Sequence, residues 1–156
     1  MEEFFDVVDE DDKVVGKATR KECHSKGLLH RSVMFVIFDS KGRILVNKRS
    51  QTKDFFPGYW SLALGGHVGS GETYDEAVVR EAFEETGLSG KPFRIGAFKK
   101  RIPEEKENVV VYGITADRKP KFDAGEIAHG EFLGLDELDG ELSKKTSCRR
   151  PRRYLA

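Results

Sequence analysis

The chain has 156 residues, enough for one domain with a substantial core and too few for two ordinary domains. It carries 27 basic and 27 acidic side chains, so its net charge points to neither a nucleic acid nor a membrane surface as a partner. No apolar run reaches the ~18 residues of a membrane helix, and the acidic N-terminus does not resemble a signal peptide. The two cysteines, Cys23 and Cys148, form neither a C-x2-C motif nor a disulfide framework, which fits a reducing compartment. We therefore expect a single cytoplasmic domain over residues 1–156 that does not bind membranes.

Charge is concentrated at the two ends of the chain. Seven of the first twelve residues are acidic, whereas residues 144–153 carry six basic residues and no acidic one. We interpret both ends as solubilising tails, the basic one covering about residues 143–156. A nucleic-acid-binding tail is the alternative, but the basic stretch lacks interleaved aromatic residues. The sequence leaves the oligomeric state open, with a homodimer as one alternative.

Strands are predicted along most of the chain. Six stretches have the apolar character of strands: 4–8, 31–38, 43–48, 93–101, 108–116 and 130–133. The second and third flank Asp39-Ser40-Lys41-Gly42, which is a hairpin signal. Residues 59–64 lead into a glycine-rich loop.

Helices are predicted at three places. Thr19 with Glu22 and Thr73 with Glu76 each form a capping-box pattern, and a short helix is expected near residues 136–142. The central helix covers residues 73–86, since Gly87 suits the left-handed position past a helix end. Its apolar stripe has three- and four-residue spacing: Tyr74, Ala77, Val78, Ala82 and Phe83. The main helix lies between strands, so we predict an α/β fold with a mixed sheet flanked by helices.

Three glutamates of the central helix, Glu81, Glu84 and Glu85, can converge on one side of it. At a separation of ~5 Å and an effective dielectric constant of ~20, each ionised pair repels by roughly 3 kcal/mol. A solvated acidic face is one interpretation. The other is a site for Mg²⁺ or Mn²⁺, which prefer carboxylate and water oxygens. A loop with four glycines precedes the helix and can bring its backbone close to a ligand: Gly65, Gly66, Gly69 and Gly71.

The loop and helix together form one pattern. It reads Gly66, five residues, Glu72, seven residues, then Arg80-Glu81-Ala82-Phe83-Glu84-Glu85-Thr86-Gly87-Leu88. This resembles the signature of the Nudix hydrolase superfamily, G-x5-E-x7-R-E-U-x-E-E-x-G-U, at nine specified positions within 23 residues. The resemblance implies a Nudix-type α/β/α sandwich around a mixed β-sheet. It also implies that the three glutamates bind a metal ion together with the Gly66 carbonyl, while Glu72 and Arg80 orient the loop and the helix.

The region before this signature resembles isopentenyl-diphosphate isomerase, an enzyme with the Nudix fold, over most of residues 4–88. The matching segments are FFDVVDEDDKVVG, RKECHSKGLLHRSVMFVIFDSKGRILVNKRS and PGYWSLALGGH. In that family three histidines and two glutamates hold a metal ion. The resemblance places five residues at those positions, with the spacing between the first two one residue short: His24, His30, His67, Glu105 and Glu107. Such a mixed ligand set favours Mn²⁺, Zn²⁺ or Fe over Mg²⁺. Taken one at a time, each histidine also fits an ordinary core or surface role.

The second resemblance fails at one position. The isomerase has a catalytic cysteine two residues before its third histidine, where this chain has Gly65. Cys23 lies beside His24 and does not align with that cysteine. The chain also keeps the full set of signature glutamates, which the isomerase lacks. We therefore expect hydrolysis of a diphosphate linkage rather than isomerisation.

The leading hypothesis is a metal-dependent hydrolase acting on a small organic diphosphate, such as a nucleoside diphosphate derivative. The expected catalytic residues are Arg80, Glu84, Glu85 and Glu107. Glu107 or Glu105, on the loop before the strand at 108–116, is the preferred general base, and Glu126 is the next candidate. The expected substrate-binding residues are Gly65, Gly66, Glu72 and Trp60.

Four aromatic residues flank the glycine loop and could stack on a base or line an apolar pocket: Phe55, Phe56, Tyr59 and Trp60. For Trp60, core packing is the competing role. Two alternative functions remain open: an isomerase acting through other groups, and a non-catalytic module that binds a metal or a ligand.

Overall fold

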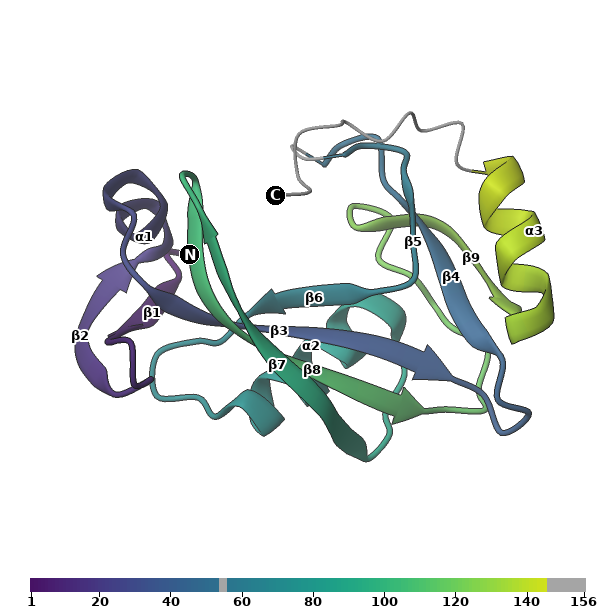
Figure 1. Ribbon diagram of the computed structural model, residues 1–156, viewed down its shortest axis with the longest axis horizontal. Coiled ribbons are helices and arrows are strands. Elements are labelled where there is room, and N and C mark those ends of the chain that lie inside the picture. The colour runs from purple at the N-terminus through teal and green to yellow at the C-terminus, as the bar shows by residue number, and fades with distance from the viewer. Residues whose placement is uncertain (54–55, 146–156) are drawn as a thin grey trace.

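Figure 1 shows the structure, a computed structural model that describes residues 1–53 and 56–145. The elements run in this order: β1 (Phe4–Val8), β2 (Val14–Thr19), α1 (Arg20–Lys26), β3 (His30–Phe38), β4 (Ile44–Arg49), β5 (Trp60–Ser61), β6 (Leu64–His67), α2 (Tyr74–Thr86), β7 (Pro92–Ile102), β8 (Glu105–Thr115), β9 (Ile127–Leu133) and α3 (Leu135–Lys145). Every predicted strand and helix is present. The exposed strand β2 is not among the predicted strands, because its sequence VVGKAT has neither a long apolar run nor alternation.

The central sheet has seven strands, with β5, β4, β3, β8 and β7 in that order, β6 paired to β3 and β9 paired to β4. The β3–β8 pair is parallel from His30 opposite Glu107 to Phe38 opposite Thr115, and the other pairs are antiparallel. The sheet is therefore mixed, as predicted. The sequence HRSVMFVIF of β3 suits this central position, since a strand with neighbours on both edges and layers on both faces is almost continuously apolar.

The hairpin predicted around Asp39 is only partly correct. The turn forms, with Asp39 accepting hydrogen bonds from the backbone of Lys41 and Arg43. However, β3 and β4 pair at only one position, Phe38 opposite Ile44. The remaining edge of β3 pairs with β6, and β4 pairs with β9 along its whole length. These partners lie far away in the sequence, so local turn signals do not reveal them.

Alternating side chains of the strands build two cores on opposite faces of the sheet. Val33, Phe35 and Ile37 of β3 pack with buried residues of α2, whereas Val36 and Phe38 face the other side. On that other side, Leu138 of α3 packs with residues of β4. Figure 1 shows α2 against the sheet near β3 and β6, and α3 along β4 and β9. This arrangement confirms the predicted α/β sandwich.

The N-terminal unit, defined as β1, β2 and α1 (residues 4–26), covers the start of β3. Its two strands form a separate two-stranded sheet. Its own core is small: Phe5, Ala18 and Cys23 are buried, with Val7 and Leu28 packed against them. Asp12, in the turn between the strands, forms an ion pair with Arg31 at 3.0 Å. The unit is therefore joined to the rest of the fold by side-chain contacts and by single backbone hydrogen bonds, such as that from the Ser70 amide to the Phe4 carbonyl at 2.8 Å, rather than by strand pairing.

Helix α2 follows the prediction closely at its ends. Thr73 and Glu76 form the reciprocal capping box, and Gly87 closes the helix in the left-handed conformation. The predicted apolar stripe is correct for Ala77, Val78 and Ala82, which are buried, but wrong for Phe83, which is 59% exposed.

Two predictions concern the C-terminal part and membranes. Residues 143–145 of the predicted basic tail belong to α3, whereas 146–156, including Cys148, lie outside the described residues. Within the described ranges, no helix combines the length and apolar character that crossing a bilayer requires.

Candidate functional site

Strand β6, which contains the first two glycines of the loop, contacts α2 at Gly66. A Cβ atom on Gly66 would lie 2.1 Å from Cδ of Glu81 and 2.3 Å and 2.5 Å from its carboxylate oxygens. The Glu81 carboxylate therefore occupies the space that any side chain at position 66 would need. A side chain at position 66 would displace this carboxylate, so glycine allows the carboxylate to stay packed against the loop.

Arg80 fastens the loop to the helix. Its Nε and Nη2 atoms donate to the two carboxylate oxygens of Glu72 at 2.8 Å and 2.9 Å, and Nη2 also donates to the His67 carbonyl at 2.9 Å. Glu72 in turn accepts a hydrogen bond from the Gly69 amide at 2.8 Å. Burial opposes ionisation of Glu72, but the hydrogen bonds from Arg80 and Gly69 outweigh it and lower its pKa. The geometry matches the orienting role that the resemblance implies for Glu72 and Arg80.

The three glutamates of α2 differ in exposure. The side chain of Glu81 is 14% exposed and that of Glu84 is 56% exposed, while the residue Glu85 is 7% exposed. Nη1 of Arg80 donates to Glu81 at 2.8 Å and to Glu84 at 3.3 Å. The cluster therefore has a buried side and a side open to solvent.

Burial makes negative charge unfavourable at the inner glutamates. It raises the pKa of Glu85 to about 8, with further contributions from the charges of Glu81 and Glu126, while Lys53 and Arg49 act in the opposite direction. Burial also raises the pKa of Glu81, despite the hydrogen bond from Arg80. Buried carboxylates that repel one another when ionised fit a hard divalent cation such as Mg²⁺ or Mn²⁺. Such a cation prefers oxygen ligands and offsets the repulsion.

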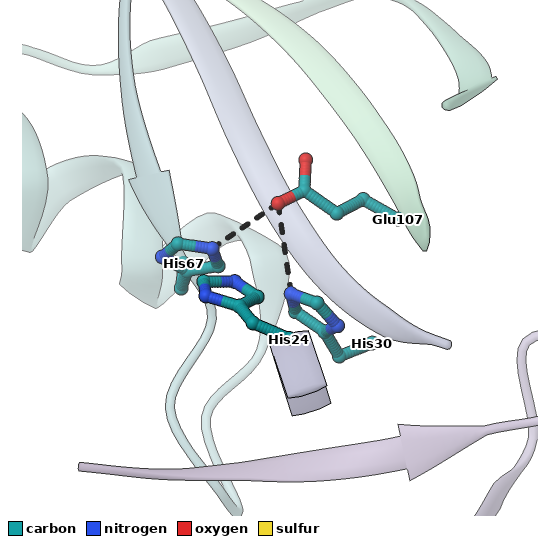
Figure 2. Close-up of side chains that lie close together, drawn as sticks. All are labelled: His24, His30, His67 and Glu107. Atoms are coloured by element: carbon teal, nitrogen blue, oxygen red, sulfur yellow. Dashed lines mark hydrogen bonds and ion pairs between the residues drawn. The ribbon is translucent and has the colours of Figure 1, made fainter. Parts of the chain in front are cut away.

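Three histidines and a glutamate lie close together on the face of the sheet opposite α2, and Figure 2 shows these four side chains. One ligand atom from each of four residues lies within 4.8 Å of the others: His24, His30, His67 and Glu107. The ring centroids of the three histidines are 5.3 Å to 5.4 Å apart in each pair. The three histidines thus approach one another and Glu107, as the second resemblance implies, but they do so on the face of the sheet opposite the helix that carries the signature glutamates.

The strand register explains why these residues meet. His30 lies opposite Glu107 in the β3–β8 pair, and Ser32 lies opposite His67 in the β3–β6 pair. Residues 30 and 32 point to the same face because side chains alternate along a strand. His24 reaches this face from α1. Four residues that are far apart in the sequence are thereby brought to one place.

The contacts prepare the ligand atoms for an ion. Nδ1 of His30 lies 2.9 Å from the Leu28 carbonyl oxygen and donates a hydrogen bond to it, which orients the ring with Nε2 toward Glu107. Nε2 of His24 and Nε2 of His30 are both buried without a hydrogen-bond partner. Buried polar atoms are normally satisfied, so these two nitrogens indicate a missing partner that accepts their lone pairs. The residues therefore fit a transition-metal ion.

Glu107 is anchored on both of its oxygens. Oε1 lies 3.1 Å from Nε2 of His67 and 3.5 Å from Nε2 of His30, and Oε2 accepts a hydrogen bond from Ser32 at 3.1 Å. Burial is the largest single influence on its pKa and acts to raise it. The neighbouring rings of His30 and His67 and the charge of Lys100 together outweigh burial, so the pKa of Glu107 is lowered. It is therefore present as a carboxylate.

The NUDIX domain family model matches residues 28–154, which is most of the chain. The chain belongs to the Nudix family. It is 38% identical over 146 residues to a protein of Streptomyces coelicolor described as the uncharacterized Nudix hydrolase SCO1686, covering 92% of this chain and 81% of that protein. It is 41% identical over 139 residues to the uncharacterized Nudix hydrolase YfcD of Shigella flexneri, covering 88% and 71% of the two chains. Among solved structures, DR0079 from Deinococcus radiodurans has a TM-score of 0.72 at 29% identity, covering 91% of this chain and 90% of that one.

Two predicted positions differ from the expected Nudix and isomerase frame. Glu105 and Glu107 lie within β8 rather than on a preceding loop. Glu105 forms an ion pair with Lys100, and it is not in the group of converging ligand atoms found among the described residues. The cluster therefore consists of three histidines and one glutamate.

No cysteine occupies the place of the isomerase cysteine. A Cβ atom on Gly65 would lie 2.5 Å from the Val33 carbonyl oxygen, so this backbone has no room for a side chain. Cys23 is buried within the N-terminal unit, and burial raises the pKa of its thiol. Neither residue is suited to transfer a proton to a substrate carbon in this geometry.

The aromatic residues near the loop divide into two groups. Trp60 packs against the core beneath α3 and contacts the His129 ring edge-on at 5.8 Å. Phe56 and Tyr59 are exposed and contact each other at 5.4 Å. Phe55 lies outside the described residues. These contacts favour core packing for Trp60 over substrate binding.

Sequence reasoning missed the partners that hold the Nudix site from outside the signature. Lys53 forms an ion pair with Glu126, and the turn that carries Glu126 packs on the C-terminal end of α2, where the Asp123 amide donates to the Glu85 carbonyl at 3.1 Å. No local signal in the sequence marks Lys53.

Sequence reasoning also missed Ser32, which donates to Glu107 in the histidine group. Ser32 could have been found, because it is two residues after His30 on the same strand.

Proposed function

We propose that this Nudix hydrolase cleaves the diphosphate linkage of a nucleoside diphosphate derivative or a similar small organic diphosphate. In this proposal, Mg²⁺ or Mn²⁺ binds Glu81, Glu84, Glu85 and the Gly66 carbonyl. The observation that carries it is the burial of Glu85 beside Glu81, which raises the pKa of Glu85 to about 8 without a cation. Buried carboxylates that repel each other destabilise a folded protein, and a bound cation offsets this repulsion.

The residues around the site have separate tasks in the proposed reaction. A bound cation supplies charge neutralisation at the phosphate oxygens and acidifies a water molecule. Arg80 and Glu72 keep the loop at a fixed distance from the helix through their paired hydrogen bonds. Gly66 leaves room for the Glu81 carboxylate against the loop. The open side at Glu84 faces solvent, where a substrate can enter.

Among the three candidate general bases, the contacts favour Glu126. Glu107 and Glu105 are two residues apart on β8 and lie on the face of the sheet opposite α2. Glu126 is partly exposed, and its turn lies against the C-terminal end of α2, where the Asp123 amide donates to the Glu85 carbonyl at 3.1 Å. Lys53 holds its carboxylate through an ion pair. We therefore assign the base role to Glu126.

A phosphate-release screen tests the hydrolase proposal. Nucleoside diphosphate derivatives, sugar nucleotides and prenyl diphosphates are incubated with Mg²⁺ or Mn²⁺ and with the parental protein, Glu85→Gln or Glu104→Gln. Glu104 is an exposed glutamate on the turn between β7 and β8 and provides a matched control. We expect Glu85→Gln to lower kcat by about 100-fold or more, as for the loss of one strong electrostatic group, and Glu104→Gln to retain parental turnover. Equal turnover of all three proteins would reject the site.

We also propose that His24, His30, His67 and Glu107 bind a second metal ion of the transition series, Zn²⁺, Mn²⁺ or Fe. Two observations support this: the convergence of the four ligand atoms and the two buried nitrogens without a partner. Neutral imidazoles with a carboxylate suit such ions better than Mg²⁺. Metal analysis of the purified protein, before and after His67→Gln, checks this site, because its stoichiometric metal should disappear in the variant.

A further inference from the structure

The four residues of the proposed His/Glu site come from two different parts of the fold. His30, His67 and Glu107 belong to adjacent strands of the central sheet, whereas His24 belongs to α1 of the N-terminal unit. The family match begins at residue 28, after this unit. An ion at this site would therefore connect the unit to the sheet that carries the hydrolase signature.

The N-terminal unit has little apolar material of its own. Three of its residues are buried in a separate small core, and two residues of β2, Val14 and Val15, are 54% and 65% exposed. A core of this size contributes little stabilisation, since burial of apolar surface is the main favourable term in folding. Additional links to the sheet are thus important for keeping α1 in place.

Phe5 lies where the unit and the histidines meet. Its ring stacks on His67 at 4.7 Å and on His30 at 5.3 Å between ring centroids. The buried Nε2 of His24 has no hydrogen-bond partner on the same side. The contact surface between unit and sheet therefore contains the ligand atoms themselves, so a partner shared by these atoms would add to the hydrogen bonds that Asp6 and Asp12 already make to the rest of the fold.

We infer that the ion at His24, His30, His67 and Glu107 has a structural role: it fastens the N-terminal unit to the central sheet. The inference rests on the proposed second metal site. Four protein ligands from separate elements, three imidazoles and one carboxylate, would fill all four positions of a tetrahedral zinc ion, as in structural sites, whereas catalytic sites keep one position open. Opening of the unit removes His24 from the ion, so binding of the ion opposes this opening.

Hydrogen exchange followed by mass spectrometry tests the inference. The full chain is compared in EDTA, in Zn²⁺ and in Mg²⁺. With free Zn²⁺ at about 100 times its Kd, exchange of amides in α1 through opening of the unit should slow by up to about 100-fold. Mg²⁺, which prefers oxygen ligands, should leave α1 unchanged. Peptides of β4 and β9 serve as the internal reference.

Two glutamine variants provide matched controls. His24→Gln removes the one ligand that the unit supplies and should abolish the Zn²⁺-dependent slowing in α1. His129→Gln, in β9 and outside the cluster, should retain it. If Zn²⁺ binds stoichiometrically but exchange in α1 stays at its EDTA rate, the structural role is wrong and the metal site stands. If Zn²⁺ does not bind, the site itself is wrong. Mg²⁺-dependent phosphate release, measured on the same samples, reports separately on the hydrolase proposal.

Discussion

The substitution Glu85→Gln should stabilise the metal-free protein at alkaline pH while it removes activity. The pKa of Glu85 is raised from 4.5 to about 8 in the folded protein. A carboxyl group with a raised folded-state pKa contributes stability that is fully present below its unfolded pKa and is lost as the pH rises through its folded pKa. Glutamine resembles the protonated carboxyl group in size and never ionises. The variant should therefore not lose this stability as the pH rises.

The size of the effect follows from the shift. One pKa unit corresponds to about 1.4 kcal/mol, so between about pH 5.5 and about pH 8.5 the contribution of Glu85 falls by about 3 kcal/mol. The advantage of Glu85→Gln over the parental protein should grow by that amount across the same range. For a chain of this size, this equals a difference of roughly 6–12 °C in Tm.

Urea or thermal denaturation in EDTA measures this difference at several pH values. Comparison with the parental protein cancels titrations that both proteins share, and Glu104→Gln controls for loss of a negative charge at an exposed position. Saturating Mg²⁺ should stabilise the parental protein much more than Glu85→Gln. A stability difference that does not change with pH, or a parental protein that is more stable than the variant at about pH 8.5, would refute the reasoning.

Three further predictions follow from the site. Gly66→Ala places a methyl group on the Glu81 carboxylate and should weaken Mn²⁺ binding by at least about tenfold in a spectroscopic titration, whereas Gly96→Ala, with open space around it, should bind Mn²⁺ normally. Glu126→Gln should lower kcat by about 100-fold with little change in Mn²⁺ affinity, and a kcat near the parental value would exclude it as the general base. Isopentenyl diphosphate incubated with the protein in deuterated water should keep its carbons unlabelled by mass spectrometry, because Gly65 has no group to transfer a proton; incorporation of deuterium would show isomerase activity.

The features predicted correctly from the sequence are those set by local interactions. The start of α2 depends on hydrogen bonds between Thr73 and Glu76, three residues apart, and its end depends on the conformation of Gly87. Both are visible in a short segment of sequence. The contact between Gly66 and Glu81 was accessible through the resemblance, because the spacing within the signature is fixed.

The features that were missed depend on long-range pairing. β4 pairs with β9 rather than extensively with β3, and Glu105 turns to Lys100 instead of the histidines. Phe83 has the correct spacing for the apolar stripe but lies on the exposed side of α2, while Glu85 is buried. Periodicity alone does not tell which side of a helix meets the sheet when a charged residue such as Glu85 is among the buried ones.

Gly66 and His67 are consecutive residues of β6 that face opposite sides of the sheet, one toward Glu81 and the other toward His24 and His30. Insertion or deletion of one residue in this strand would exchange their directions, placing an imidazole against the carboxylates of α2 and leaving the histidine group without one of its members. Insertions and deletions in natural or engineered relatives should therefore be confined to the loops on either side of Leu64–His67. A single-residue insertion within this strand, even of an uncharged residue, should disable the proposed glutamate site and the proposed His/Glu site together.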